Sequence, residues 1–230
     1  MPTSIDDNRA SREAVLARVR KALGKTGRDA QGEADAKAYI AAHRQGPRPT
    51  MPEDLVTRFE TRAKHMASTV ERIASVNEVP GCVARYLAAL DLPPLLAAQK
   101  SHAGVCWPEF ADLDWAGAGL SIEPRPTVGN DRLGITGSFC GIAETGTLVF
   151  VTGAATPTAT ALLPDTHIAV VSADRIVSGM EEAFALVRNE FEVMPRGINM
   201  ISGPSRTGDI EQTIVLGAHG PYRVHILLVG

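Results

Sequence analysis

The sequence predicts an α/β protein with a mostly parallel sheet flanked by helices and a helical extension at the N-terminus. Three observations predict this class. The chain has 230 residues, of which 44% are hydrophobic and 21% charged, a composition typical of globular proteins. Its second half contains short apolar runs separated by turns, and helical stripes lie between these runs. Strands that alternate with helices are typical of parallel sheets.

The first 52 residues differ from the rest in composition and in the pattern of apolar residues. Residues 11–23 form an amphipathic pattern with Val15 and Val19 on its apolar stripe and Gly24 after its end. We interpret its basic polar side as a solvated helix face. Residues 26–52 are rich in glycine and proline and predict a connector or mobile arm. We therefore expect an N-terminal helix and flexible arm over residues 1–52 and one α/β domain over residues 53–230.

The remaining elements follow from periodicity. Apolar residues at helical spacing from Leu55 to Ile73 predict one helix, and Pro80 begins a second. Short apolar runs predict strands at 95–98, 120–122, 147–152, 167–172 and 224–229. A stripe over 175–191 predicts a helix with a capping box of Ser178 and Glu181, and Asp209 is placed to cap a helix over 210–216.

Composition excludes several functional classes. The net charge of −3 and the 5% of aromatic residues disfavour nucleic-acid binding. The polar start and the lack of a long apolar run argue against a signal peptide and a membrane span, so we expect a cytoplasmic protein. Three widely spaced cysteines without a Cys-x-x-Cys pair indicate reduced thiols, and they argue against a metal or iron–sulfur cluster held by this chain.

The segment 134–150 contains the first candidate site. It places the carboxylate of Glu144 among glycines in an apolar run, beside the hydroxyls of Thr145 and Thr147. Gly146 permits a positive φ or a close approach of the backbone to a ligand. If Glu144 is desolvated, it suits a general acid, a general base or a nucleophile. The alternative is that Glu144 closes a hairpin or caps a helix.

A second glycine-rich turn follows at residues 202–209. Gly203 sets a tight turn, while Ser202, Ser205 and Thr207 offer hydroxyls and Arg206 offers a planar fork. This set suits a carboxylate or a phosphate, with Arg206 making the bidentate contact. The alternative is that Arg206 pairs with a nearby acid and only fixes the loop. We expect the two turns to form opposite walls of one anion-binding cleft at the carboxyl ends of the strands.

For the other reactive side chains, we favour a structural role or leave the role undecided. His219, in a turn before the last strand, could shuttle a proton or could simply hydrogen-bond its own turn. His167 and His225 lie within strand-like runs and are interpreted as core or face residues. Cys140 is interpreted as a buried thiol because no partner histidine is placed beside it by the sequence.

Several ordered motifs resemble a known family, the lactate-utilization protein C members of the LUD group. The resemblance covers the chain from about Leu95 to the C-terminus. The motifs are Gly134-Ile-Thr, Ile142-Ala-Glu-Thr-Gly-Thr-Leu148, Leu163-Pro164 with His167-Ile-Ala-Val170, Arg175-Ile-Val177, Ser202-Gly-Pro-Ser-Arg-Thr207 with Asp209-Ile-Glu211, and Gly217-Ala-His-Gly-Pro221.

The resemblance implies a fold like that of ribose-phosphate isomerases and CoA transferases. It also implies a role in oxidising L-lactate to pyruvate with two partner proteins, at least one of which carries iron–sulfur clusters. Longer family members have cysteine motifs for clusters, which this chain lacks. We therefore expect a cluster-free subunit that binds no cofactor itself and passes electrons through cysteine-rich partners.

Three functional hypotheses remain open. In the first, Arg206 and the amides of its loop hold the lactate carboxylate while Glu144 or His219 assists removal of the 2-hydroxyl proton. In the second, the chain is a free-standing enzyme similar to CoA transferases or sugar-phosphate isomerases that uses Glu144 as nucleophile or base. In the third, it is a non-enzymatic scaffold or regulator that binds a small anion.

Overall fold

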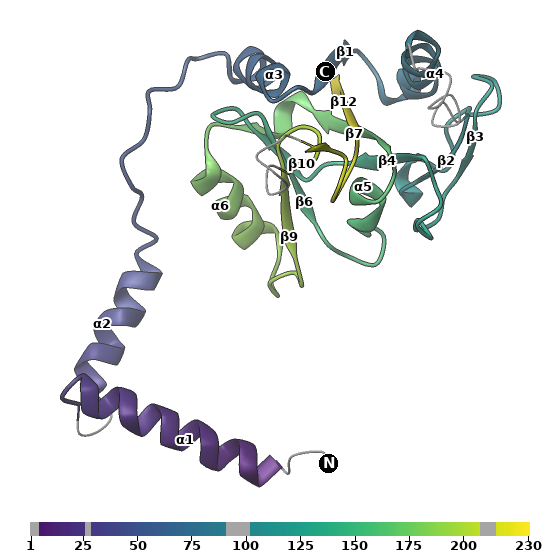
Figure 1. Ribbon diagram of the computed structural model, residues 1–230. Helices are drawn as coiled ribbons and strands as arrows, with labels where there is room; N and C mark the ends of the chain where they lie inside the picture. The colour runs from purple at the N-terminus through teal and green to yellow at the C-terminus, as the bar shows by residue number, and fades with distance from the viewer. Residues whose placement is uncertain (1–4, 26–28, 91–101, 208–214) are drawn as a thin grey trace. The chain divides into compact units, whose positions relative to one another are not determined.

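The computed structural model describes residues 5–25, 29–90, 102–207 and 215–230. The chain divides into two compact units, Met1–Pro49 and Thr50–Gly230. The first unit contains the helices α1 (Ile5–Ala22) and α2 (Ala30–Ala41) (Figure 1). Most of their described residues are exposed. No helix within the described ranges is long and apolar enough to cross a membrane.

The segment predicted as a connector contains helix α2. The Asp29 side chain accepts a hydrogen bond from the Gly32 amide at 2.8 Å, which caps the helix. An alanine-rich run then favours the helical conformation despite Gly32. The glycines and prolines that indicated a connector lie mainly outside this stretch, and α2 has no buried residues, so the segment contains a helix that was not predicted but is not part of the core.

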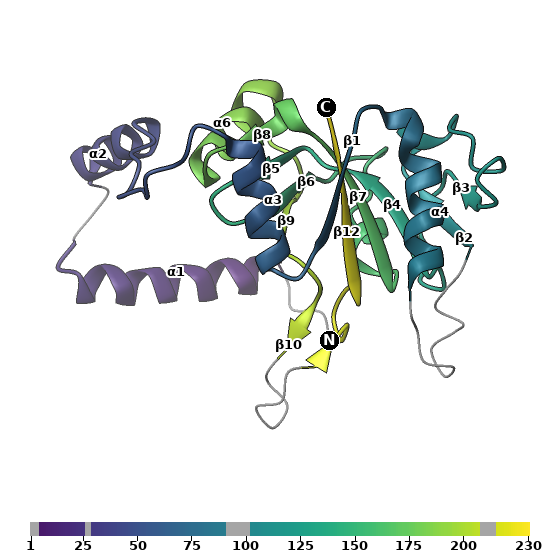
Figure 2. The same ribbon diagram turned by 90° about the horizontal axis from the view of Figure 1, so that it is seen from above.

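The second unit is built on a six-stranded parallel sheet with the strand order β1-β12-β7-β4-β2-β3. Its strands are β1 (Thr69–Ile73), β2 (Ala103–Cys106), β3 (Ser121–Glu123), β4 (Leu133–Gly137), β7 (Thr166–Ser172) and β12 (Arg223–Val229). The last strand therefore lies inside the sheet, between β1 and β7 (Figure 2). The predicted α/β class with a mostly parallel sheet flanked by helices is confirmed.

A second, four-stranded sheet has the order β8-β5-β6-β9 and contains both parallel and antiparallel pairs. Its strands are β5 (Cys140–Ile142), β6 (Thr147–Val151), β8 (Ile176–Val177) and β9 (Ile198–Ile201). A short hairpin of β10 (Arg206–Thr207) and β11 (Val215–Leu216) completes the set.

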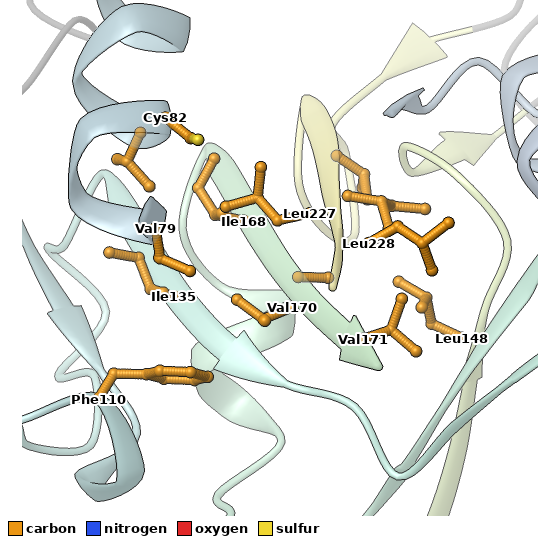
Figure 3. Close-up of a cluster of buried hydrophobic side chains, with 14 of the residues drawn as sticks. Val79, Cys82, Phe110, Ile135, Leu148, Ile168, Val170, Val171, Leu227 and Leu228 are labelled. Atoms are coloured by element: carbon orange, nitrogen blue, oxygen red, sulfur yellow. The ribbon is translucent and has the colours of Figure 1, made fainter. Parts of the chain in front are cut away.

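Both faces of the parallel sheet are covered, which explains why its central strands are mostly apolar. Helix α4 (Val79–Ala89) packs on one face, where Val79 and Cys82 approach Ile168 of β7 (Figure 3). On the other face, Val171 of β7 lies near Leu148 of β6. Because successive strand residues point to opposite faces, a strand buried on both faces reads as a continuous apolar run.

The remaining helices are α3 (Leu55–His65), α5 (Ala159–Leu162) and α6 (Met180–Glu190). Helix α3 contacts β1 and β8, α5 contacts β4 and β7, and α6 contacts β5 and β8. Within the described residues, three 3₁₀ helices add short turns: η1 (Val76–Glu78), η3 (Pro108–Phe110) and η4 (Ala173–Arg175).

Several element boundaries differ from the predictions. The helix expected to reach Ile73 ends at His65, and Ala67 then adopts a positive φ of 66° before β1 begins. The β-branched residues of β1 favour a strand, although their spacing also fits a helix. The helix expected over 175–191 begins at Met180, and Glu182 accepts the Gly179 amide at 3.0 Å in place of the predicted capping box.

Two predictions fall partly or wholly outside the described residues. The strand at 95–98 lies in the undescribed range 91–101. Most of the helix expected over 210–216, with its cap Asp209, also lies outside the described residues, but Val215 and Leu216 form strand β11. Pairing with β10 gives the backbone of β11 hydrogen-bond partners, whereas the last four carbonyls of a helix have no partners within the helix.

Candidate functional site

The two glycine-rich turns meet. Residues 143–146 join β5 to β6, and β6 pairs with β9 so that Leu148 lies opposite Ile201. This register places Thr147 beside Ser202, and their hydroxyl oxygens are 2.6 Å apart. The Thr145 hydroxyl lies 2.7 Å from that of Thr147. Three hydroxyls from segments more than 50 positions apart therefore form one hydrogen-bonded chain.

Two glycines hold these turns against the C-terminal end of α3. Gly146 and Gly203 have φ values of 71° and 77°, which favour glycine. A Cβ on Gly146 would overlap the backbone of Ala63, and a Cβ on Gly203 would overlap the carbonyl oxygen of Met66. The motif glycines thus permit close packing of backbone on backbone.

The location of the turns differs from the expected one. Gly203 contacts Met66, just before β1 begins, and the Ser205 amide donates to the Pro221 carbonyl, just before β12 begins. The turn after β9 therefore lies at the amino edge of the parallel sheet, as Figure 2 shows for the β10–β11 hairpin. The expectation of a site at the carboxyl ends was wrong because neither turn follows a strand of the parallel sheet: the first joins β5 to β6, and the second joins β9 to β10.

Ser205 links the second turn to the segment that carries His219. Its hydroxyl accepts the His219 amide at 3.4 Å, and its carbonyl accepts the Gly217 amide at 3.0 Å. The His219 and Arg206 residues are exposed, and Thr207 is half-buried. This edge therefore presents a histidine and a guanidinium to solvent on neighbouring segments.

The charged candidates do not contact one another. Glu144 is half-buried, and its amide donates to the Ser178 carbonyl at 3.0 Å, beside the start of α6. Among the described residues, no ion pair or hydrogen bond joins the side chains of Glu144, Arg206 and His219. The structure thus joins the hydroxyls of the two motifs, while the three ionisable groups remain separate around them.

The residues given structural interpretations are buried. Burial lowers the pKa of His167 to about 3, and its Nε2 lies 2.8 Å from the Thr136 hydroxyl. Burial also lowers the pKa of His225 to about 4, although Glu71 opposes this effect. The Cys140 pKa is raised to about 11 by burial, so its thiol stays protonated at neutral pH. These interpretations are confirmed.

In the part of the chain that the structure describes, no three His, Cys, Asp or Glu side chains gather in a way that could hold a metal ion. The three cysteines Cys82, Cys106 and Cys140 are all buried and free of disulfides.

The sequence did not identify the carboxylate at the carboxyl edge of the sheet. Strand β2 ends at Cys106 and continues through Trp107 into η3, which carries Glu109. Glu109 lines two cavities of about 320 and 300 Å³. Desolvation raises the pKa of its carboxyl group, and a hydrogen bond from the Gly137 amide opposes this. If the apolar run before Trp107 had been recognised as strand β2, Glu109 would have been placed at this edge.

The protein thus has an α/β fold of two stacked sheets. The two glycine-rich turns that carry sequence motifs lie at the amino edge of the parallel sheet. The LUD domain family model matches residues 111–229, just over half of the chain. This chain therefore belongs to the LUD domain family. The match includes the motif segments that resemble this family in the sequence.

Curated relatives support the same assignment. The chain is 36% identical over 172 residues to lactate utilization protein C of Geobacillus kaustophilus, covering 66% of this chain and 69% of that protein. Proteins of the same name from Bacillus licheniformis and Bacillus subtilis are 34% and 38% identical over 129 and 101 residues. These matches cover 54% and 43% of this chain, and 53% and 42% of the relatives. The chain thus spans about half the length of several curated relatives it matches.

One solved structure shares the fold. A crystal structure of a DUF162 family protein from Deinococcus radiodurans superposes with a TM-score of 0.53 at 23% identity. The superposition covers 79% of this chain and all of that one.

Proposed function

We propose that this chain takes part in lactate utilization, as a cluster-free component of a system that oxidises L-lactate to pyruvate. The names of its curated relatives support the pathway. The observation that carries the proposed site is the 2.6 Å contact between the Thr147 and Ser202 hydroxyls, which joins two separate family motifs.

The chemistry of this junction suits a small carboxylate. The two hydrogen bonds among Thr145, Thr147 and Ser202 use two of the three hydroxyl protons, so the chain keeps one hydroxyl proton to donate to a carboxylate oxygen. In this proposal the Arg206 guanidinium adds a bidentate contact, supported by the backbone and hydroxyls of Gly203, Ser205 and Thr207.

A base beside the bound carboxylate would take the proton of the 2-hydroxyl group. Glu144 and His219 are the two candidates, because Glu144 lies in the turn between β5 and β6 and the His219 amide donates to the Ser205 hydroxyl of the second turn. Both groups would have to approach the ligand on binding, since catalytic hydrogen bonds tighten in the substrate complex.

Oxidation of lactate to pyruvate releases two electrons and two protons, so the electrons need an acceptor. We propose that iron–sulfur clusters in cysteine-rich partner subunits accept them, while this chain contributes substrate handling. A tagged chain expressed in its native host tests this point by copurification followed by an iron assay. Recovery of iron-containing partners is expected, and a solitary iron-free protein contradicts the proposed complex.

Growth tests the function in the cell. Deletion of the gene is expected to abolish growth on L-lactate but not on glucose, and the wild-type chain should restore it. Arg206→Gln should fail to restore growth on lactate. The matched control is Arg188→Gln, because Arg188 is an exposed arginine at the end of α6. Unchanged growth of the deletion strain on lactate contradicts the proposed function.

Calorimetric titration with L-lactate tests the site itself. Loss of the Arg206 contact is expected to weaken binding at least tenfold, because a charge-assisted hydrogen bond contributes about 1.5–3 kcal/mol. Binding that persists in Glu144→Gln, with normal lactate growth of that variant, would favour the non-enzymatic anion-binding hypothesis instead.

A further inference from the structure

A second potential ligand site lies at the opposite edge of the sheet, where β2 and β4 end. Ligands of open α/β sheets bind beyond the carboxyl ends of the strands. Here Trp107 follows β2 directly, and Ser138 follows β4. Both residues line the cavity of about 320 Å³. This volume lies in the range of small-molecule sites.

Three aromatic side chains line this cavity: Trp107, Phe139 and Phe191. The Trp107 ring is fixed by a hydrogen bond of 3.2 Å from Nε1 to the Pro157 carbonyl. The Phe139 and Phe191 rings are 5.8 Å apart and tilted by 48°. Flat apolar walls of this kind accept a planar ring.

The Phe139 wall is held in place from behind. The Arg175 guanidinium lies 4.7 Å from the Phe139 ring centre, and its Nε donates to the Phe139 carbonyl at 2.9 Å. Two further hydrogen bonds of 2.7 and 3.1 Å attach Arg175 to Glu190 at the end of α6. Arg175 therefore braces the wall and is already engaged with a carboxylate.

The polar groups of the cavity are a carboxyl and hydroxyls. Glu109 is an exposed residue, but one carboxylate oxygen lies so close over Gly137 that a Cβ there would overlap it. Ser138, Thr152 and Thr156 also line the cavity, and their hydroxyls bond to the Cys140 carbonyl, the Thr158 hydroxyl and the Val151 carbonyl. Among the described residues, no cation forms a salt bridge with Glu109.

These features select the class of ligand. A site with a carboxyl and no lining cation repels carboxylates and phosphates, so lactate does not fit it. A carboxyl instead accepts hydrogen bonds from N–H groups, and the aromatic walls favour a flat ring. We propose that the cavity bounded by Trp107, Phe139, Phe191 and Glu109 binds a planar nitrogen heterocycle that presents N–H donors to Glu109.

Fluorescence offers a direct test on the full chain, because it contains two tryptophans, Trp107 and Trp115. Adenosine, guanosine and riboflavin are the probes. We expect saturable quenching by at least one of them. Trp107→Phe should remove the quenching, since the remaining Trp115 donates to the Phe110 carbonyl and does not line the cavity.

Calorimetry with the same probes separates the contribution of the Glu109 carboxyl to binding from that of the aromatic walls. Glu109→Ala is expected to weaken binding at least tenfold, while Glu53→Gln, which changes an exposed carboxylate in the turn before α3, should leave it unchanged. Circular dichroism and thermal unfolding verify that each variant is folded. No binding of any probe at millimolar concentration, or equal binding by wild type and Glu109→Ala, overturns the proposal. Neither result affects lactate binding at the other edge.

Discussion

The two edges of the parallel sheet use similar residue types for different purposes. At the amino edge, Gly146 and Gly203 bring the turn backbones into contact with α3, and hydroxyls bond to one another. At the carboxyl edge, Gly137 leaves space for the Glu109 carboxylate beside two cavities. Glycine-rich motifs can therefore report dense backbone packing as well as room for a ligand.

This difference affects how the family motifs are interpreted. Among the segments that resemble the family, the two glycine-rich turns meet at the amino edge, where Gly146 and Gly203 are needed for the fold whether or not a ligand binds. The carboxyl edge has the aromatic walls and a partly desolvated carboxyl. Variants that separate packing from binding at each edge will sharpen the comparison.

The largest effect is expected from Gly203→Ala. The new Cβ would overlap the Met66 carbonyl, and the residue would keep a positive φ. Backbone strain and overpacking together should lower the free energy of unfolding by about 3 kcal/mol or more. Urea denaturation measures this loss. The control is Gly129→Ala, where φ is 91° but no atom lies within 4 Å, and the loss should be about 1 kcal/mol. Equal losses would contradict the packing role.

The next effect concerns the buried His225, which stacks on Tyr86 at 4.2 Å and lies beside Thr69 at the start of β1. Its pKa is lowered to about 4 in the folded protein, so below pH 6.5 the unfolded chain binds the proton first. This contribution to stability is complete above about pH 6.5 and is lost as the pH falls toward 4, by up to about 3 kcal/mol.

Denaturation at several pH values measures this loss. The variant His225→Asn should show a flatter dependence between pH 6.5 and 4 than the wild type. His167 also has a lowered pKa and should contribute the same sign in both proteins. Parallel profiles of variant and wild type would show that His225 titrates normally.

A smaller effect is expected where the two motifs join. Thr147→Val and Ser202→Ala each remove one hydroxyl of the 2.6 Å pair, and each should lower stability by about 1 kcal/mol. A double-mutant cycle should give a coupling of at least about 0.5 kcal/mol. As a control, Thr147→Val combined with Thr158→Ala should be additive, because Thr158 bonds to Thr152 beyond the other end of β6.

The smallest effect on stability is expected from Gly137→Ala. Its Cβ would meet only the end of the Glu109 side chain, which can move away, so stability should change by less than about 1 kcal/mol. In Gly134→Ala, on the same strand, the Cβ would overlap the Thr160 carbonyl and should cost about 1–3 kcal/mol. Thermal unfolding compares the two. A large loss at Gly137 would show that this edge is as rigid as the other.

The sequence predicted the α/β class and the strands β7 and β12 well, because both strands are mostly apolar and buried on both faces. It failed at β1, whose residues fit both a helical and a strand period. It also missed β2, β4 and β5, whose apolar runs contain glycines, and the short strands β8 and β9. At the candidate site, the sequence predicted that the two glycine-rich turns lie together, but it placed them at the wrong edge of the parallel sheet.

The sequence alone therefore determined the buried strands, the buried histidines and cysteines, and the family motifs, because these depend on residue type and local order. Tertiary structure decided which turns face each other and which edge each occupies. The pairing of β6 with β9 brings Thr147 to Ser202, and the parallel alignment of β2 with β4 brings Glu109 over Gly137. Strand pairing between distant segments fixes such contacts, and no local pattern encodes it.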